Sequence, residues 1–282
     1  MANPILNDKS MKEASEAGYA SGRWAPPQGA MGRSTVIPGG ISGISDGPIS
    51  DWHSQTMTVQ GTASATGVLF VVLLAAAAFG WSLVKTQAGV ITDFPRWIIA
   101  GVLVGFGCVI LMRFKPQWAK FLGFAYALAE GAVVGAISHA YEVYQKGIVI
   151  QAVGATVAVF AVMLFLYRTN IIKVTDRFRR IIVGATVGIM IFYGIALLIN
   201  LFGGSVSFLS SNNTSAFSIG FSFFVAALAA FNLALDFDFI EKGTKQGLPK
   251  QMEWVAAVGL MVTIVWLYLE ILRLLAKLNN RR

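Results

Sequence analysis

The sequence predicts an all-α membrane protein with seven transmembrane helices. Of its 282 residues, 56% are hydrophobic and only 13% are charged, whereas a soluble domain carries about 25% charged residues. The mean hydropathy of +0.66 indicates the same class. A membrane-spanning helix needs about 20 mostly apolar residues, and seven stretches of the chain approach or exceed that length.

The seven stretches are separated by short segments that carry charged, polar or proline residues. They comprise residues 66–84, 97–112, 118–144, 148–167, 181–202, 217–238 and 252–278. The second stretch lies between Pro95 and Pro116, which suits a single helix because proline cannot continue one.

The N-terminal 64 residues have a different composition. They are rich in Gly, Ser, Ala and Pro and show no hydrophobic periodicity, so they cannot bury enough apolar surface to offset the entropy of ordering. We expect a disordered tail over residues 1–64 and a seven-helix domain over residues 65–282, with the first helix starting between Thr58 and Thr66. The tail has no apolar run, so we expect an uncleaved signal-anchor rather than a cleavable signal peptide.

The distribution of Lys and Arg predicts the orientation. With the N-terminus in the cytoplasm, most basic residues of the tail and loops fall on the cytoplasmic side of the cell membrane, as the positive-inside rule requires. The basic C-terminus, which would then lie outside, argues the other way. The net charge of +8 is explained by these loops and does not indicate a nucleic-acid partner.

Three carboxylates lie at the end of the sixth apolar stretch or just after it: Asp236, Asp238 and Glu241. A carboxylate at or inside a membrane boundary costs several kcal/mol unless it is paired, protonated or wetted. On a helix, Asp238 shares a face with Glu241 and Lys242, which indicates a solvated helix end. Asp236 points to nearly the opposite side and lies deeper, so it is the candidate for an interior role, although it can also face interfacial water.

Three further titratable residues lie in the third stretch. Glu130 is flanked by long apolar runs, and burial near mid-membrane favours the neutral form of a carboxylate. It is either a cation or proton site or a neutral acid bonded to a neighbouring helix. His139 and Glu142 are three residues apart near the end of the same helix, where an interfacial structural role and an ion-path role are both open.

Three other charged residues could serve as countercharges or partners. Glu270 and Arg273 are three residues apart in the last stretch, and a local ion pair would lower the cost of placing both there. Arg113 ends the second stretch, where it either snorkels to the cytoplasmic surface or opposes a carboxylate.

Several classes of function are not supported by any pattern. The chain has no glycine-rich phosphate loop, no credible Ser-His-Asp set and no mid-membrane lysine for a retinal Schiff base. One cysteine and two distant histidines are too few for a metal cluster of those ligands. We therefore expect neither an enzyme nor a resident cofactor.

Small residues recur at a spacing of four. The pairs are Gly101/Gly105, Gly131/Gly135 and Gly184/Gly188. Such pairs let helix backbones approach closely in lipid, so they favour a tight bundle, although ordinary membrane glycine usage explains them as well.

Several motifs together resemble a known family. They are residues 126–131 with Gly135, residues 141–142, 147–152, 236–241, 252–254 and 266–273. This combination, over about residues 56–280, resembles the Bax inhibitor-1/YccA-like family of transmembrane Bax inhibitor motif proteins, in its bacterial form with a longer tail. The resemblance implies seven helices with the last surrounded by the other six, and a pH-sensitive calcium leak.

The resemblance also implies a regulatory pair of aspartates, one ending helix six and one within helix seven. Asp236 matches the first. Residues 260–265, at the depth expected for the second, contain no acid. Three alternatives are open for the second acid of the pair. Glu270 replaces it if the local sequence pattern decides, and Glu253 replaces it if antiparallel packing decides, because Glu253 would then lie nearer to Asp236. The third alternative is that Asp236 acts alone.

The leading hypothesis is a pH-sensitive cation leak channel or exchanger, with calcium as the implied ion. Protonation of Asp236 would gate it, Glu130 would lie along the path, and these two carboxylates would supply oxygen ligands to the passing ion. The alternative is a non-transporting membrane regulator that binds a membrane protease or stress-response partner through the tail. The expected partners are the lipid bilayer, calcium or protons, and that membrane protein.

Overall fold

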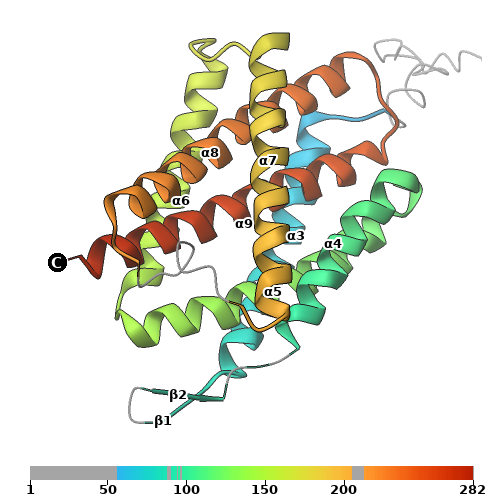
Figure 1. Ribbon diagram of the computed structural model, residues 1–282. Coiled ribbons are helices and arrows are strands. Elements are labelled where there is room, and N and C mark those ends of the chain that lie inside the picture. Colours follow the sequence, from blue (N-terminus) through green and yellow to red (C-terminus); the bar gives the residue numbers. More distant parts are fainter. Residues whose placement is uncertain (1–55, 88–89, 94, 96, 205–212, 282) are drawn as a thin grey trace, which may run out of the picture. The chain divides into compact units, whose positions relative to one another are not determined.

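The computed structural model describes residues 56–87, 90–93, 95, 97–204 and 213–281. This part of the chain folds into seven α-helices and one short two-stranded sheet (Figure 1). The helices are α3 (Val59–Ser82), α4 (Ile98–Phe114), α5 (Ala119–Tyr144), α6 (Ile148–Arg168), α7 (Asp176–Leu201), α8 (Ala216–Lys245) and α9 (Met252–Asn279). The all-α membrane class and the seven helices are confirmed.

Six of the seven helices are long and apolar enough to cross a membrane. The exception is α4, whose 17 residues span about 25 Å, somewhat less than a bilayer core of about 30 Å. The chain is therefore a multi-pass membrane protein in which α4 is the marginal span.

Capping explains where two helices begin. Thr58 has an extended backbone directly before α3, and its side chain accepts a hydrogen bond from the Gly61 amide at 2.9 Å. The α3 helix therefore starts within the expected window of Thr58 to Thr66. Thr175 caps α7 in the same way, with Asp176 in the first turn complementing the helix dipole. Residues 59–64 thus belong to α3, while residues 1–55 of the predicted tail lie outside the described residues.

Two short elements were not predicted. Strands β1 (Lys85–Gln87) and β2 (Val90–Asp93) pair antiparallel between α3 and α4, and the 3-10 turn η1 (Pro116–Trp118) precedes α5. Three or four residues are too few to show a period of two, so the hairpin carries no hydrophobic signal in the sequence.

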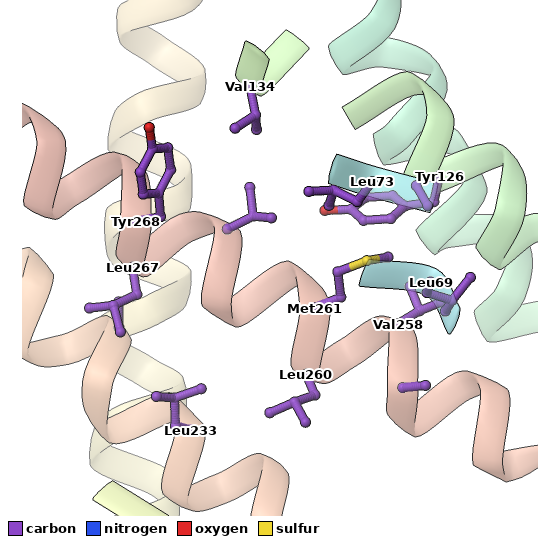
Figure 2. Close-up of a cluster of buried hydrophobic side chains, with 14 of the residues drawn as sticks. Leu69, Leu73, Tyr126, Val134, Leu233, Val258, Leu260, Met261, Leu267 and Tyr268 are labelled. Carbon is purple, nitrogen blue, oxygen red and sulfur yellow. The ribbon is translucent and has the colours of Figure 1, made fainter. Parts of the chain in front are cut away.

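The last helix lies at the centre of the described helices. In Figure 1, α9 runs between α3 and α5 on one side and α6 and α8 on the other, and it packs along all four. Figure 2 shows Val258 and Met261 of α9 beside Leu69 of α3 and Tyr126 of α5. The α4 helix packs mainly on α5 and α7 mainly on α8, so α9 is enclosed mostly by four helices rather than evenly by six.

Glycine permits the closest helix contact, between α3 and α5. A Cβ atom at Gly131 or Gly135 would overlap the backbone carbonyl of Leu73 or Ala77. Gly101 and Gly105 of α4 likewise face Val133 and Glu130 of α5. A Cβ at Gly184 or Gly188 meets no described atom within 4 Å, so two of the three predicted pairs make helix contacts and the third faces outward.

Candidate functional site

One face of α9 carries polar residues along its C-terminal half. They recur at alternating spacings of three and four residues: Thr263, Trp266, Glu270, Arg273 and Lys277. The antiparallel helix α8 faces them with four polar residues: Ser218, Ser222, Asn232 and Asp236. We call these nine residues the α8–α9 seam. Such spacing keeps side chains on one helix face, so α9 carries a polar stripe inside an apolar bundle, and the polar residues of α8 form one pair toward each end of it.

Two contacts define the register of the seam. Lys277 meets Ser222 at one end, and Thr263 meets Asp236 at the other. On each helix the two contacting positions are 14 residues apart, about 21 Å along the axis. The seam therefore covers most of the thickness of a bilayer core.

Asp236 contains one of the two buried side-chain atoms that lack a hydrogen-bond partner in the described part of the chain. Its Oδ2 is buried and has no hydrogen-bond partner. The other such atom is Nε1 of Trp266, one turn along α9 from Thr263. A buried unpaired acceptor and a buried unpaired donor on the same seam are uncommon in folded proteins and call for an explanation.

The Thr263 hydroxyl can serve either protonation state of Asp236. It lies 3.2 Å from the Gly259 carbonyl and also interacts with the Asp236 carboxyl group. A neutral Asp236 can donate its proton to Thr263 while Thr263 donates to Gly259. An ionised Asp236 can only accept, so Thr263 must rotate its proton away from Gly259.

The middle of the seam is lined by α7. Asn232 donates to the Thr186 hydroxyl at 2.8 Å. Further along, Glu270 is 1% exposed and accepts hydrogen bonds from Tyr193 at 2.9 Å and from Arg273 at 3.0 Å. Arg273 also donates to the Tyr193 hydroxyl at 2.7 Å. The α7 helix thus makes one side-chain hydrogen bond with α8 and a separate polar network with α9.

Comparison with protein families decides which family this architecture represents. A family model described as Bax inhibitor 1 like matches residues 3–280. The chain belongs to this family. The match also includes most of residues 1–55, which we had placed outside the resemblance. No curated protein and no solved structure matched the chain.

In this Bax inhibitor 1 like chain, the structure places neither candidate partner beside Asp236. Glu253 is 5% exposed and accepts hydrogen bonds from the Thr58 amide at 2.9 Å and the Thr58 hydroxyl at 2.8 Å. It therefore holds the start of α3 to the start of α9. Glu253 and Glu270 lie about 15 Å and about 10 Å along α9 from Thr263, which is the residue that does face Asp236.

Asp238 is buried, which corrects the expectation of a solvated helix end. It is 5% exposed, and its Oδ2 lies 2.8 Å from both Arg179 of α7 and Lys242. The sequence could not show Arg179, because α7 is distant along the chain. Glu241 remains 45% exposed and bonds to Tyr167 and Lys245, so this residue alone fits the solvated description.

The predicted residues of α5 lie outside the seam. Glu130 faces Gly105 of α4, and no hydrogen bond or ion pair joins it to another described residue. His139 stacks on Trp81 at 4.7 Å and bonds to the Trp81 carbonyl at 2.7 Å. Glu142 accepts from the amides of Gly147 and Val149, which satisfies free donors at the start of α6.

The remaining candidates are not brought together either. Arg113 is exposed at the end of α4, where a snorkelling side chain fits. Within the described ranges, no three His, Cys, Asp or Glu residues cluster as a metal site, and Asp236 and Glu130 lie at different helix interfaces. The seam residues that we had not singled out, Thr263, Trp266 and Lys277, share the period of Glu270 and Arg273, and that period was the available signal.

Proposed function

We propose that this chain is a pH-sensitive cation leak channel or exchanger gated by protonation of Asp236. Calcium is the ion that the family resemblance suggests. The observation that carries the proposal is the buried, unpartnered Oδ2 of Asp236 at one end of the α8–α9 seam. A carboxylate in that position is tolerated in a dry bundle when it is neutral and is costly when it is ionised.

The proposed gate follows from these two states. At low pH, neutral Asp236 bonds to Thr263 and the seam stays closed and dry. At higher pH, the ionised carboxylate draws water and a cation between α8 and α9, because a charge in a membrane is stabilised by hydration or a counter-ion. Cation flux is therefore expected to rise with pH.

The neighbouring charges support a gate that rests on Asp236 alone. Asp238, on the other side of α8, is compensated by Arg179 and Lys242. Glu270 is compensated by Arg273, and Glu253 is held by Thr58. Asp236 faces an uncharged threonine, so among the acidic residues of α8 and α9 its proton is the one whose loss is least compensated by the protein.

The test is calcium flux into proteoliposomes as a function of pH. Wild-type flux should fall as the pH is lowered, and Asp236→Asn, a neutral isostere, should show low flux with no pH response. Glu241→Gln, on the same helix but half-exposed, is the matched control and should behave as wild type. If wild-type protein passes no calcium at any pH, or if Asp236→Asn retains the full pH response, the proposal fails.

Glu130→Gln tests whether the path also includes the α4–α5 interface. A reduced flux with an unchanged pH dependence would place Glu130 along the path, as the sequence suggested. An unchanged flux would restrict the path to the α8–α9 seam.

The alternative function, a non-transporting regulator, predicts a different set of results. Liposomes would be silent at all pH values, and native membranes would yield a stable protein partner that is lost when residues 1–55 are deleted. The extension of the family match to residue 3 favours testing this deletion, because it indicates that the N-terminal stretch recurs in the family.

A further inference from the structure

At the end of the seam farther from Asp236, a lysine is enclosed by protein. Lys277 is 0% exposed, and the two serines that face it, Ser218 and Ser222, are 0% and 1% exposed. The three residues join the last turns of α9 to the first turns of α8. Lysine is almost never fully buried in proteins, so this arrangement needs an explanation.

The position of Lys277 makes its burial more notable. It lies two residues before Asn279, where α9 ends. A lysine so close to a helix end can extend its flexible stem to interfacial water. Here the side chain turns instead toward α8, although the route to water is short.

Three oxygen atoms of α8 lie within hydrogen-bond distance of the ammonium group. Nζ lies 2.8 Å from the Ser218 hydroxyl, 2.9 Å from the Ser222 hydroxyl and 3.3 Å from the Ser218 carbonyl. An ammonium has three donors, and these three oxygens on one helix supply an acceptor for each. We call Ser218 and Ser222 with these three oxygens the serine cage. The oxygens replace part of the hydration shell of a cation.

A second positive charge lies nearby on the same face of α9. Arg273 is one turn before Lys277 and pairs with Glu270. Cations near a helix C-terminus are favoured by the helix dipole. The half of the seam farther from Asp236 therefore carries two fixed positive charges and one negative charge, which opposes the entry of a free divalent cation.

We propose that Lys277 is a tethered cation that occupies a cation-binding site built by the serine cage and thereby closes this end of the seam to free cations. The site would accept a small monovalent ion that can donate N–H bonds, of the ammonium or alkylammonium class. Its consequence for transport rests on the proposed function, since Lys277 then determines which ions leave or enter the seam. The binding site itself does not depend on transport.

Chemical rescue tests the cage without any flux measurement. Lys277→Ala shortens the side chain and should lower the Tm of the purified protein in detergent by about 5 °C. Ethylammonium should restore at least half of that loss, whereas tetramethylammonium, which has the same charge but no N–H donor, should not. Lys245→Ala, which removes an exposed lysine paired with Glu241, is the matched control and should not respond to ethylammonium.

Two results would overturn the cage. One is a Tm of Lys277→Ala that ethylammonium and tetramethylammonium raise equally, or not at all. The other is an equal response of Lys245→Ala, which would indicate a general salt effect.

Potassium flux tests the closing role and covers the case in which Lys277→Ala does not fold. Lys277→Met keeps the volume of the stem and removes the charge. In proteoliposomes at a pH where wild-type flux is highest, it should increase potassium leak about tenfold or more, as expected when an electrostatic barrier of this kind is removed. An unchanged leak would refute the closing role.

The two tests separate this inference from the proposed function. If neither the wild type nor any variant passes calcium but ethylammonium restores the Tm of Lys277→Ala, the proposed function fails and the serine cage stands. If wild-type flux responds to pH but Lys277→Met leaks no more potassium than wild type, the Asp236 gate stands and the closing role of Lys277 fails.

Discussion

The Glu270–Arg273 pair allows a sharp test of whether Glu270 is part of the gate or part of the scaffold. Replacing one partner of a buried ion pair leaves the other uncompensated and costs about 3–5 kcal/mol. The side chain of Arg273 is 26% exposed and that of Glu270 is 2% exposed, so the two single substitutions should not be equivalent.

The magnitudes follow from what each substitution leaves behind. Glu270→Leu leaves Arg273, which keeps some exposure and its bond to Tyr193 at 2.7 Å, so we expect the free energy of unfolding to fall by about 3 kcal/mol. Arg273→Met leaves Glu270 buried with only the Tyr193 donor, so we expect it to fall by about 5 kcal/mol. The double variant replaces both charges by apolar groups of similar volume and should lie within about 1 kcal/mol of wild type.

The assay is reversible unfolding in mixed detergent micelles for all four proteins, followed by calcium flux across pH for the folded ones. The double variant should keep the pH response, because Asp236 and Thr263 are unchanged. If the double variant loses as much free energy of unfolding as the two single variants together, the ion-pair reasoning is wrong. Loss of the pH response in a well-folded double variant would assign the gate to Glu270 instead of Asp236.

The other two predictions concern helix packing and capping. Gly135→Ala should lower the Tm, because its Cβ would overlap the Ala77 carbonyl and overpacking costs about 1–3 kcal/mol. Gly188→Ala is the control, since its Cβ meets no described atom within 4 Å, and it should leave the Tm equal or higher. Equal effects of the two substitutions would contradict the close approach of α3 and α5. Thr58→Val should destabilise by about 1–2 kcal/mol, since it removes both the α3 cap and the hydroxyl donor to Glu253. Thr66→Val removes only a bond to the Thr62 carbonyl within the helix and is the control, so a similar loss in both variants would argue against the cap.

Much of the candidate site could be read from the chain, but only where the signal was local. Asp236 was separated from Asp238 by helix geometry alone, and the ion pair of Glu270 with Arg273 followed from their spacing. The burial of Asp238 was missed because Arg179, which compensates it at 2.8 Å, lies on another helix. Glu253 could not be assigned either, since its partner Thr58 is 195 residues away.

The sequence by itself determined that this is a multi-pass helical membrane protein, which segments form its long apolar helices, and that Asp236 and Asp238 point to nearly opposite sides of the sixth one. These follow from apolar length and helical period, which are local properties. Only the tertiary structure decided that Asp236 faces Thr263 rather than a second acid, and that Lys277 turns into the serine cage rather than toward water. Those facts depend on the register between α8 and α9. This register arises from the packing of the two helices against each other, so the sequence of either helix alone does not predict it.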